Sequence, residues 1–307
     1  NSAFGEGALY TNTTANANTA MGRLALYTTT TGANNTAVGY HALQNNTAAN
    51  NTAVGSGCFQ TNTTATGNTG VGIHVGLYTT TGYALTGMGQ SALGNNTTGH
   101  SNTALGYQTL YDNTTGHSNV AVGNNALANN TTASQNTAVG LTAMFTNTEG
   151  VENVAVGYEA LKSNTTAHTN HAFGYRALKA NTTGNANTAV GHQSLDANTT
   201  GSNNTAVGLA SLGANTTGYD NTAIGRQALE FNTTGHQQTA IGKFALNGVT
   251  GANNTALGQD AGRYTTTGAS NVFLGQNAGS LITSGSTNTV VGRYNGNGGG
   301  GGLDIRT

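Results

Sequence analysis

The sequence predicts an all-β protein, a parallel β-solenoid (β-roll) of about eighteen 17-residue coils. A phrase of the type Asn-Thr-Ala-Val-Gly recurs with a period of 17 residues, and so short and strict a period is typical of chains in which each repeat stacks on its neighbours. Gly lies beside β-branched residues in the repeats, which disfavours helix. Only 6% of the residues are charged, and Pro and Trp are absent, so an ordinary globular core is not expected.

The repeats begin at residues 1, 18, 35, 51, 68, 85, 102, 119, 136, 153, 170, 187, 204, 221, 238, 254, 271 and 288. We call each repeat a coil, numbered 1 to 18 along the chain. Each position within a coil is a slot, and slot 1 is the Asn of the repeated phrase. Slots 2 to 5 predict a first strand, slots 8 to 10 a second, and slots 11 to 16 a polar turn.

The direction of each slot follows from the two-residue period of a strand. Slot 4 is apolar in every coil, from Phe4 to Val291, so we expect it to face the core together with slot 2. Slot 9 is Leu in most coils and is expected to supply the facing half of the core. Slot 3 is nearly always Ala or Gly, and slot 5 is always Gly, so the opposite strand face consists of small residues.

A face of small residues lets another backbone approach closely, or relaxes the φ restriction at a tight corner. Each coil offers two large apolar side chains, worth about 1.5–3 kcal/mol each when buried, against about 1–2 kcal/mol of backbone entropy per ordered residue. We therefore expect three chains to bury their small faces together as a homotrimer. The structural and interface residues predicted on this basis are Ala37, Gly39, Gly106, Ala155, Gly157, Ala206 and Gly208.

Composition argues against several functions. The 9 Lys and Arg against 10 Asp and Glu provide no basic stripe for nucleic acid, and no apolar run is long enough to span a membrane. Cys58 is alone, which leaves no intrachain disulfide framework, and we expect it to be a small buried residue at slot 8. Neither a catalytic constellation nor a phosphate-binding loop is present, so we expect neither an enzyme nor a cofactor.

The C-terminal coils predict a domain boundary. Gly replaces Leu at slot 9 in the last three coils, at Gly262, Gly279 and Gly296, which suggests a narrowing solenoid. Residues 1–294 are expected to form the repeat shaft, and residues 295–307 a Gly-rich taper leading to a further domain. Because Asn1 is already in register with the repeat, we expect the sequence to be an excerpt of a longer or processed chain.

The repeated phrases NTAVGYHAL, NTALGYQTL and NVAVGYEAL resemble the head repeats of trimeric autotransporter adhesins, which build a trimeric parallel β-roll. The longer phrase is similar to repeat arrays of phage tail fibres, and the C-terminal NTVVGRYNGNGGGGGLDIRT is similar to the segment that leads towards their C-terminal chaperone-type domain. The period of 17 is longer than that of the adhesin heads. The resemblance implies the rigid shaft of an extracellular or virion-surface fibre, which joins other fibre domains and contributes to binding a host glycan or receptor.

Two alternatives remain. A monomeric ice-binding β-solenoid would also be regular and rich in Thr, but it needs a flat exposed Thr-x-Thr face, whereas the Thr of slot 2 is expected beside the core. A subunit of an end-to-end extracellular filament is favoured by coil 1, which has no polar cap over its strand edges.

Candidate binding residues are sparse. Tyr107, Tyr158 and Tyr175 share slot 6, and the last two, in consecutive coils, could form a stacked platform for a sugar or simply a ladder that covers the sheet. His100 and His117 share slot 16 of adjacent coils, where they could stack or could ligate a metal, although the carboxylates and thiols to complete a metal site are missing. The Asn-x-Thr triplets of the turns read either as glycosylation sites or as a stacked amide ladder; they begin at Asn12, Asn62, Asn113, Asn164, Asn181, Asn198, Asn215 and Asn232.

Overall fold

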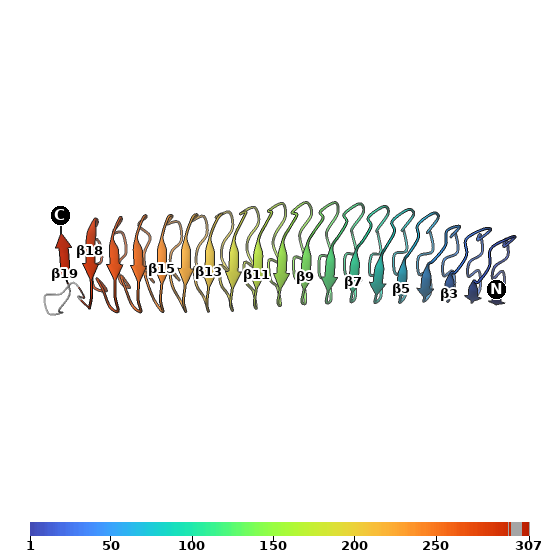
Figure 1. Cartoon of the computed structure of the whole chain (residues 1–307), viewed down its shortest axis with the longest axis horizontal. Coiled ribbons are helices and arrows are strands. Elements are labelled where there is room, and N and C mark those ends of the chain that lie inside the picture. The colour runs from blue at the N-terminus through green and yellow to red at the C-terminus, as the bar shows by residue number, and fades with distance from the viewer. Residues whose placement is uncertain (294, 296–302, 307) are drawn as a thin grey trace. The chain divides into compact units, whose positions relative to one another are not determined.

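The computed structural model describes residues 1–293 and 295, and residues 303–306 as backbone. It divides the chain into two compact units, residues 1–152 and 153–307. In each unit, every coil contributes one short strand, and successive strands lie side by side (Figure 1). No helix occurs among the described residues. The predicted all-β parallel solenoid is therefore confirmed within each unit.

In coils 1 to 17 the strand occupies slots 2 to 4, whereas the strand of coil 18 begins at slot 1. In the first unit they are β1 (Ser2–Phe4), β2 (Thr19–Met21), β3 (Thr36–Val38), β4 (Thr52–Val54), β5 (Thr69–Val71), β6 (Thr86–Met88), β7 (Thr103–Leu105), β8 (Val120–Val122) and β9 (Thr137–Val139). In the second they are β10 (Val154–Val156), β11 (His171–Phe173), β12 (Thr188–Val190), β13 (Thr205–Val207), β14 (Thr222–Ile224), β15 (Thr239–Ile241), β16 (Thr255–Leu257), β17 (Val272–Leu274), β18 (Asn288–Val291) and β19 (Leu303–Arg306).

The strands of each unit pair in parallel with no register shift between equivalent slots. Thr103 lies opposite Val120 in the first unit, and Thr205 opposite Thr222 in the second. The backbone of β19 instead pairs antiparallel with β18. The predicted taper at 295–307 otherwise lies outside the described residues, as does Gly296.

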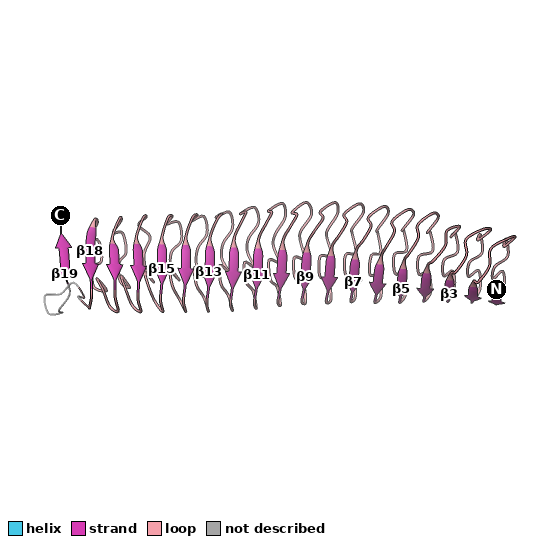
Figure 2. Ribbon diagram, in the orientation of Figure 1, coloured by secondary structure: helices cyan, strands magenta, loops and turns pink. Residues whose placement is uncertain are grey.

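Among the described residues, no strand occurs at slots 8 to 10, and the prediction of a second strand there is wrong. Figure 2 shows a single strand per coil, with the rest of each coil as turns and loops. His41 and Leu43, at slots 7 and 9, have φ values of 58° and 49°, whereas a β-strand needs strongly negative φ. The segment still bonds between coils, because the N–H of Leu43 donates to the carbonyl of Cys58 at 3.0 Å.

The strand faces also point opposite to the prediction. Slots 2 and 4 do share a face, but it is the outer one. Phe173 at slot 4 is 42% exposed, whereas Ala172 at slot 3 is fully buried. The slot 3 residues predicted at a chain–chain interface lie inside their own coil and are unavailable to a partner; they are Ala37, Ala155 and Ala206, each 0% exposed.

The small slot 3 residue is required because the interior of a coil is narrow. The buried Leu of slot 9, correctly predicted to be in the core, leaves room for little more than a methyl group opposite it. Where slot 3 carries Phe273 instead, the facing slot 9 residues are Gly262 and Gly279, and a Cβ on either would lie within 2.5 Å of the Phe273 ring. These two glycines therefore accommodate a large core residue, and the narrowing predicted from Gly262, Gly279 and Gly296 stays a prediction.

Two ladders of asparagines fill the rest of the interior. In slot 1, Asn102 Nδ2 donates to the carbonyl of Gly116 at 2.8 Å, and Asn102 Oδ1 accepts the backbone N–H of Asn119 at 2.9 Å. In slot 12, Asn113 Nδ2 donates to Asn96 Oδ1 at 2.7 Å and also to the carbonyl of Gly116 at 3.0 Å. Each ladder satisfies buried backbone groups that would otherwise be orphaned, and both hold the polar turn against the strand.

The slot 5 glycines form a tight corner at the end of each strand. Gly39, Gly106, Gly157 and Gly208 have φ between 131° and 139°. A Cβ on Gly106 would lie 2.6 Å from the carbonyl oxygen of Gly123 in the next coil. These glycines therefore serve the tight corner and the close approach of a neighbouring backbone, which belongs to the same chain.

Candidate functional surfaces

The outer face of each sheet exposes a row of apolar side chains. It combines slot 2, mostly Thr, with slot 4, which is always Val, Ile, Leu, Met or Phe. Met88 is 54% exposed, Val120 40% and Leu257 45%. Contiguous exposed apolar surface of this kind marks an interaction site more often than solvated surface. We call the outward slot 2 and slot 4 side chains of one unit its strand face.

The predicted tyrosines are only partly brought together. Tyr158 and Tyr175 stack with ring centroids 5.2 Å apart, and His192 extends the stack at 4.8 Å from Tyr175. Tyr107 lies in the other unit, is 42% exposed and joins no ring stack. Because the stacked rings cover each other's faces, the ladder offers a ligand mainly ring edges, which is a poor platform for a sugar.

A charged cluster lies beside this stack in a chain that is otherwise poor in charge. Glu159 accepts from Lys162 Nζ at 2.7 Å, from Arg176 Nε at 3.0 Å and from Lys179 Nζ at 3.0 Å. These hydrogen bonds, that from Lys162 first, lower the pKa of Glu159 to about 2. Arg176 also lies over the Tyr175 ring, 5.5 Å from its centroid, so the cluster and the stack are one continuous surface.

The His100–His117 pair stacks as predicted, with centroids 4.9 Å apart, and Tyr83 extends it. Within the part of the chain that the structure describes, no three His, Cys, Asp or Glu residues are grouped as metal ligands. Likewise, none of the described residues forms a helix that could cross a membrane.

Seven of the eight predicted Asn-x-Thr triplets begin at an asparagine in the interior, whereas Asn12 is half-buried. Asn62, Asn113, Asn181 and Asn198 are fully buried, and Asn198 Nδ2 donates to Asn181 Oδ1 at 2.8 Å. A glycan on such an amide is incompatible with the folded coil. Cys58 is also fully buried, as expected, and burial raises the pKa of its thiol to about 12.

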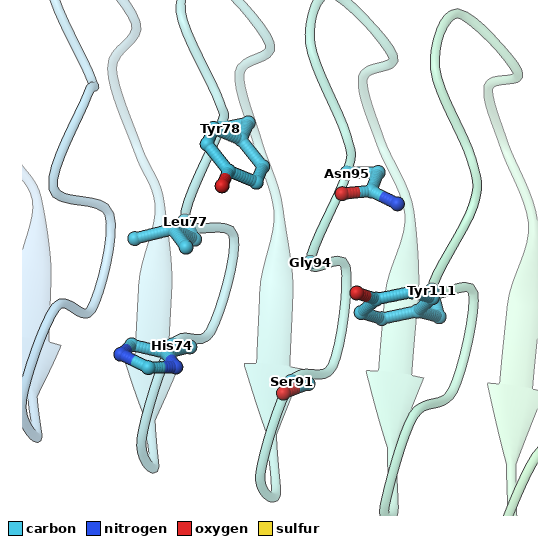
Figure 3. Close-up of a pocket in the computed structure, with 7 residues that line it drawn as sticks. All are labelled: His74, Leu77, Tyr78, Ser91, Gly94, Asn95 and Tyr111. Atoms are coloured by element: carbon cyan, nitrogen blue, oxygen red, sulfur yellow. The ribbon is translucent and has the colours of Figure 1, made fainter.

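Two hollows that the sequence analysis did not anticipate occur where slot 10 is Gly. In the first unit, a pocket of about 90 Å³ surrounds Gly94, with Tyr78 on one side and Tyr111 on the other (Figure 3). In the second unit, a groove of about 300 Å³ lies over Gly213. The sequence signal that indicates these hollows is a Gly at slot 10, a position that carries Tyr, Lys or Glu in other coils.

Comparison of the chain with protein-family models, curated proteins and solved structures finds no match.

Proposed function

We propose that this protein is the structural shaft of an extracellular fibre, located outside the cell or on a virion, and that it acts as a rigid spacer without enzymatic activity. The observation that carries the proposal is the strand face, an apolar row that recurs in every coil and is exposed or half-buried along its length. Repetition supplies many equivalent weak contacts, which gain avidity when they are linked in one chain.

The proposed partner on the strand face is a second and third copy of this chain. A strand of three residues is about 10 Å long, and nine strands spaced about 4.8 Å apart give about 430 Å² of sheet per unit. The strand faces of the two units add up to about 860 Å², and a trimer would divide this area between two partners at about 430 Å² each, which is about half of the roughly 800 Å² per partner of a standard protein interface. The resemblance to trimeric fibre repeats favours three copies. The proposed contact between them is made by the side chains of slots 2 and 4, and not by the small residues of slots 3 and 5.

Light scattering on a size-exclusion column tests this proposal. A trimer has three times the chain mass of 30.7 kDa. In the second unit, Val190→Lys and Val207→Lys place charges on the strand face, and we expect them to shift the mass to that of a monomer. Leu209→Lys is the matched control, because Leu209 is exposed at slot 6, off the strand face. A monomeric wild-type protein would refute the assembly, and a mass that grows with concentration would indicate an open filament.

Ice binding by a monomer is the second candidate, and one observation favours it. The slot 2 threonines lie on the outer face and not beside the core: Thr188, Thr205 and Thr222 are half-buried and follow one another in register. The outer face therefore carries one Thr per coil in a regular array, with an apolar residue at slot 4 where a Thr-x-Thr face would have a second Thr. A monomer that lowers the freezing point below the melting point, and loses this effect on Thr205→Lys, would support ice binding over the fibre.

A further inference from the structure

The 300 Å³ hollow in the second unit exists because coil 13 lacks side chains where its neighbours have them. Slots 7, 10 and 11 of this coil are Ala210, Gly213 and Ala214. On one side lie Gln193 and Asp196, and on the other Glu230 and Phe231, all of which line the hollow together with the three small residues. We call this hollow the coil 13 groove.

The comparison with coil 6 shows that a Gly at slot 10 does not by itself leave an open groove. A Cβ on Gly94 would lie 2.6 Å from Tyr111 Cε2, because the Tyr111 ring leans over the glycine and fills most of the space (Figure 3). Around Gly213, the nearest atom to such a Cβ is the carbonyl oxygen of Ala210, in the same coil, at 3.2 Å. The three atoms nearest to such a Cβ all belong to Ala210, and the coil 13 groove is the larger of the two hollows.

Two carboxylates form opposite walls of the groove. Glu230 is held in place by Gln227 Nε2 at 2.8 Å and Asn247 Nδ2 at 3.1 Å. Asp196 Oδ1 is buried without a hydrogen-bond partner, and burial raises the pKa of this carboxyl. Because Oδ1 is enclosed, the acceptor that the half-buried Asp196 offers to a ligand hydroxyl in the groove is its other carboxylate oxygen.

The remaining lining is apolar and suits the C–H face of a sugar ring. Ala210 and Ala214 form a floor without polar side-chain atoms, and Phe231 stands at the rim, 57% exposed. The charges of Arg176 and Lys179 act on Asp196 from the other side and favour its ionised form, which moderates the negative potential of the groove. The combination of fixed acceptors, an amide and an apolar floor is typical of sites that orient a small polar ligand.

We propose that the coil 13 groove binds a neutral pyranose unit of a surface glycan, with hydroxyl groups donating to Asp196 and Glu230 and the ring packed on Ala210 and Phe231. The inference adds glycan attachment to the proposed fibre shaft and rests on its location outside the cell or on a virion for the source of the glycan. Neutral sugars are favoured over acidic ones because two carboxylates line the groove.

Saturation-transfer-difference NMR tests the site with the methyl pyranosides of glucose, galactose, mannose and N-acetylglucosamine as probes. Gly213→Gln fills the groove with a side chain at a slot that carries Lys or Glu in other coils, and Asp196→Asn removes one acceptor with little change of shape. We expect at least one probe to bind the wild-type protein and to lose about ten-fold or more in affinity in each variant. Glu149→Gln, which removes an exposed carboxylate in the other unit, is the control and should bind unchanged.

The outcomes separate this inference from the fibre proposal. If no pyranoside signal depends on Gly213 and Asp196, or if only a primary amine such as ethylamine competes for the groove, the glycan site is refuted, whatever the mass of the protein. A monomer whose pyranoside signal is lost in Gly213→Gln would instead retain the site and refute the assembly. Thermal unfolding of each variant, matched to wild type, shows that a lost signal does not come from unfolding.

Discussion

Replacement of a single interior asparagine should destabilise the first unit far more than its size suggests. Asn35 is fully buried in slot 1 of coil 3. Its Nδ2 donates to the carbonyl of Ala48 at 2.8 Å, and its Oδ1 accepts the backbone N–H of Asn51, in the next coil, at 2.9 Å. Asn35→Ala removes these bonds and a longer one from Nδ2 to the carbonyl of Gly32 at 3.3 Å, and it leaves the buried N–H of Asn51 without this acceptor.

The expected loss of stability follows mainly from the unpaired N–H of Asn51 and from the lost hydrogen bond to Ala48. An unpaired buried donor costs about 1–3 kcal/mol, and the lost bond to Ala48 a further 0.5–1.5 kcal/mol or so. The carbonyl of Ala48 keeps a second donor, Asn46 Nδ2 at 2.8 Å, so it adds no orphan of its own. We therefore expect Asn35→Ala to lower the free energy of unfolding by about 2–4 kcal/mol.

Urea denaturation followed by circular dichroism measures the loss, and hydrogen exchange with mass spectrometry shows whether opening is confined to coils 3 and 4. Asn45→Ala is the matched control, since Asn45 is exposed in the same coil and only its backbone N–H is bonded, to Gln60 at 3.1 Å. If the two variants differ by less than about 0.5 kcal/mol, the interior ladder does not stabilise the fold as argued. Asn35→Asp should be more stable at acidic than at neutral pH, because an ionised carboxylate would face the Ala48 carbonyl.

Three further predictions concern single residues. Gly106→Ala should lower the free energy of unfolding, measured by urea denaturation, by at least about 2 kcal/mol. The reason is that Gly106 has a φ of 139° and that a Cβ there would lie 2.6 Å from the carbonyl oxygen of Gly123. An unchanged urea midpoint would contradict the tight corner. Cys58 should resist thiol reagents until the protein unfolds, and because its folded pKa of about 12 exceeds its ordinary value of 9.0, stability should fall as the pH rises above 9. Cys58→Ala should abolish that slope, and a slope that persists would assign it to other groups. The pKa of Glu159 is lowered from 4.5 to about 2, so its contribution to stability should be present above pH 4.5 and be lost as the pH falls towards 2; Glu159→Gln should flatten this part of the pH profile, and an unchanged profile would count against the charge cluster.

The coil period, the position of the strand and the pairing of slots 2 and 4 on one face could all be predicted from the sequence. Whether that face points inward or outward could not be predicted from the size of its residues, because large apolar side chains usually fill the core, whereas here they lie outside. The sequence does contain a sign that slot 3 faces inward. The large Phe273 at slot 3 occurs together with Gly262 and Gly279 at slot 9, and such an exchange of sizes is expected when the two slots share one narrow interior.

The second strand could not be excluded from residue preferences. The pair Ala-Leu at slots 8 and 9 is compatible with a strand or a helix. A turn with positive φ at Leu is not expected, because the Cβ of a non-glycine residue is crowded in that conformation. Leu43 and Leu110 nevertheless adopt φ of 49° and 48°, because this backbone turns the side chain inward while its N–H reaches the next coil. The bonds of Leu43 to Cys58 and of Leu110 to Ala126 offset the strain.

Functional specificity in such a chain has to lie where the coils differ from one another. Slots 1, 3, 9 and 12 are restricted to amides and a few small or apolar residues, because each must fit the same narrow interior. Slots 6, 7, 10 and 11 face outward and vary freely, from Gly213 to Lys179 at slot 10 alone. The charged cluster around Glu159 and the coil 13 groove are both built from these variable slots. Because a repeat changes its outer residues without disturbing its interior, the uniform strand face suits assembly, whereas a single irregular coil suits recognition of one particular ligand.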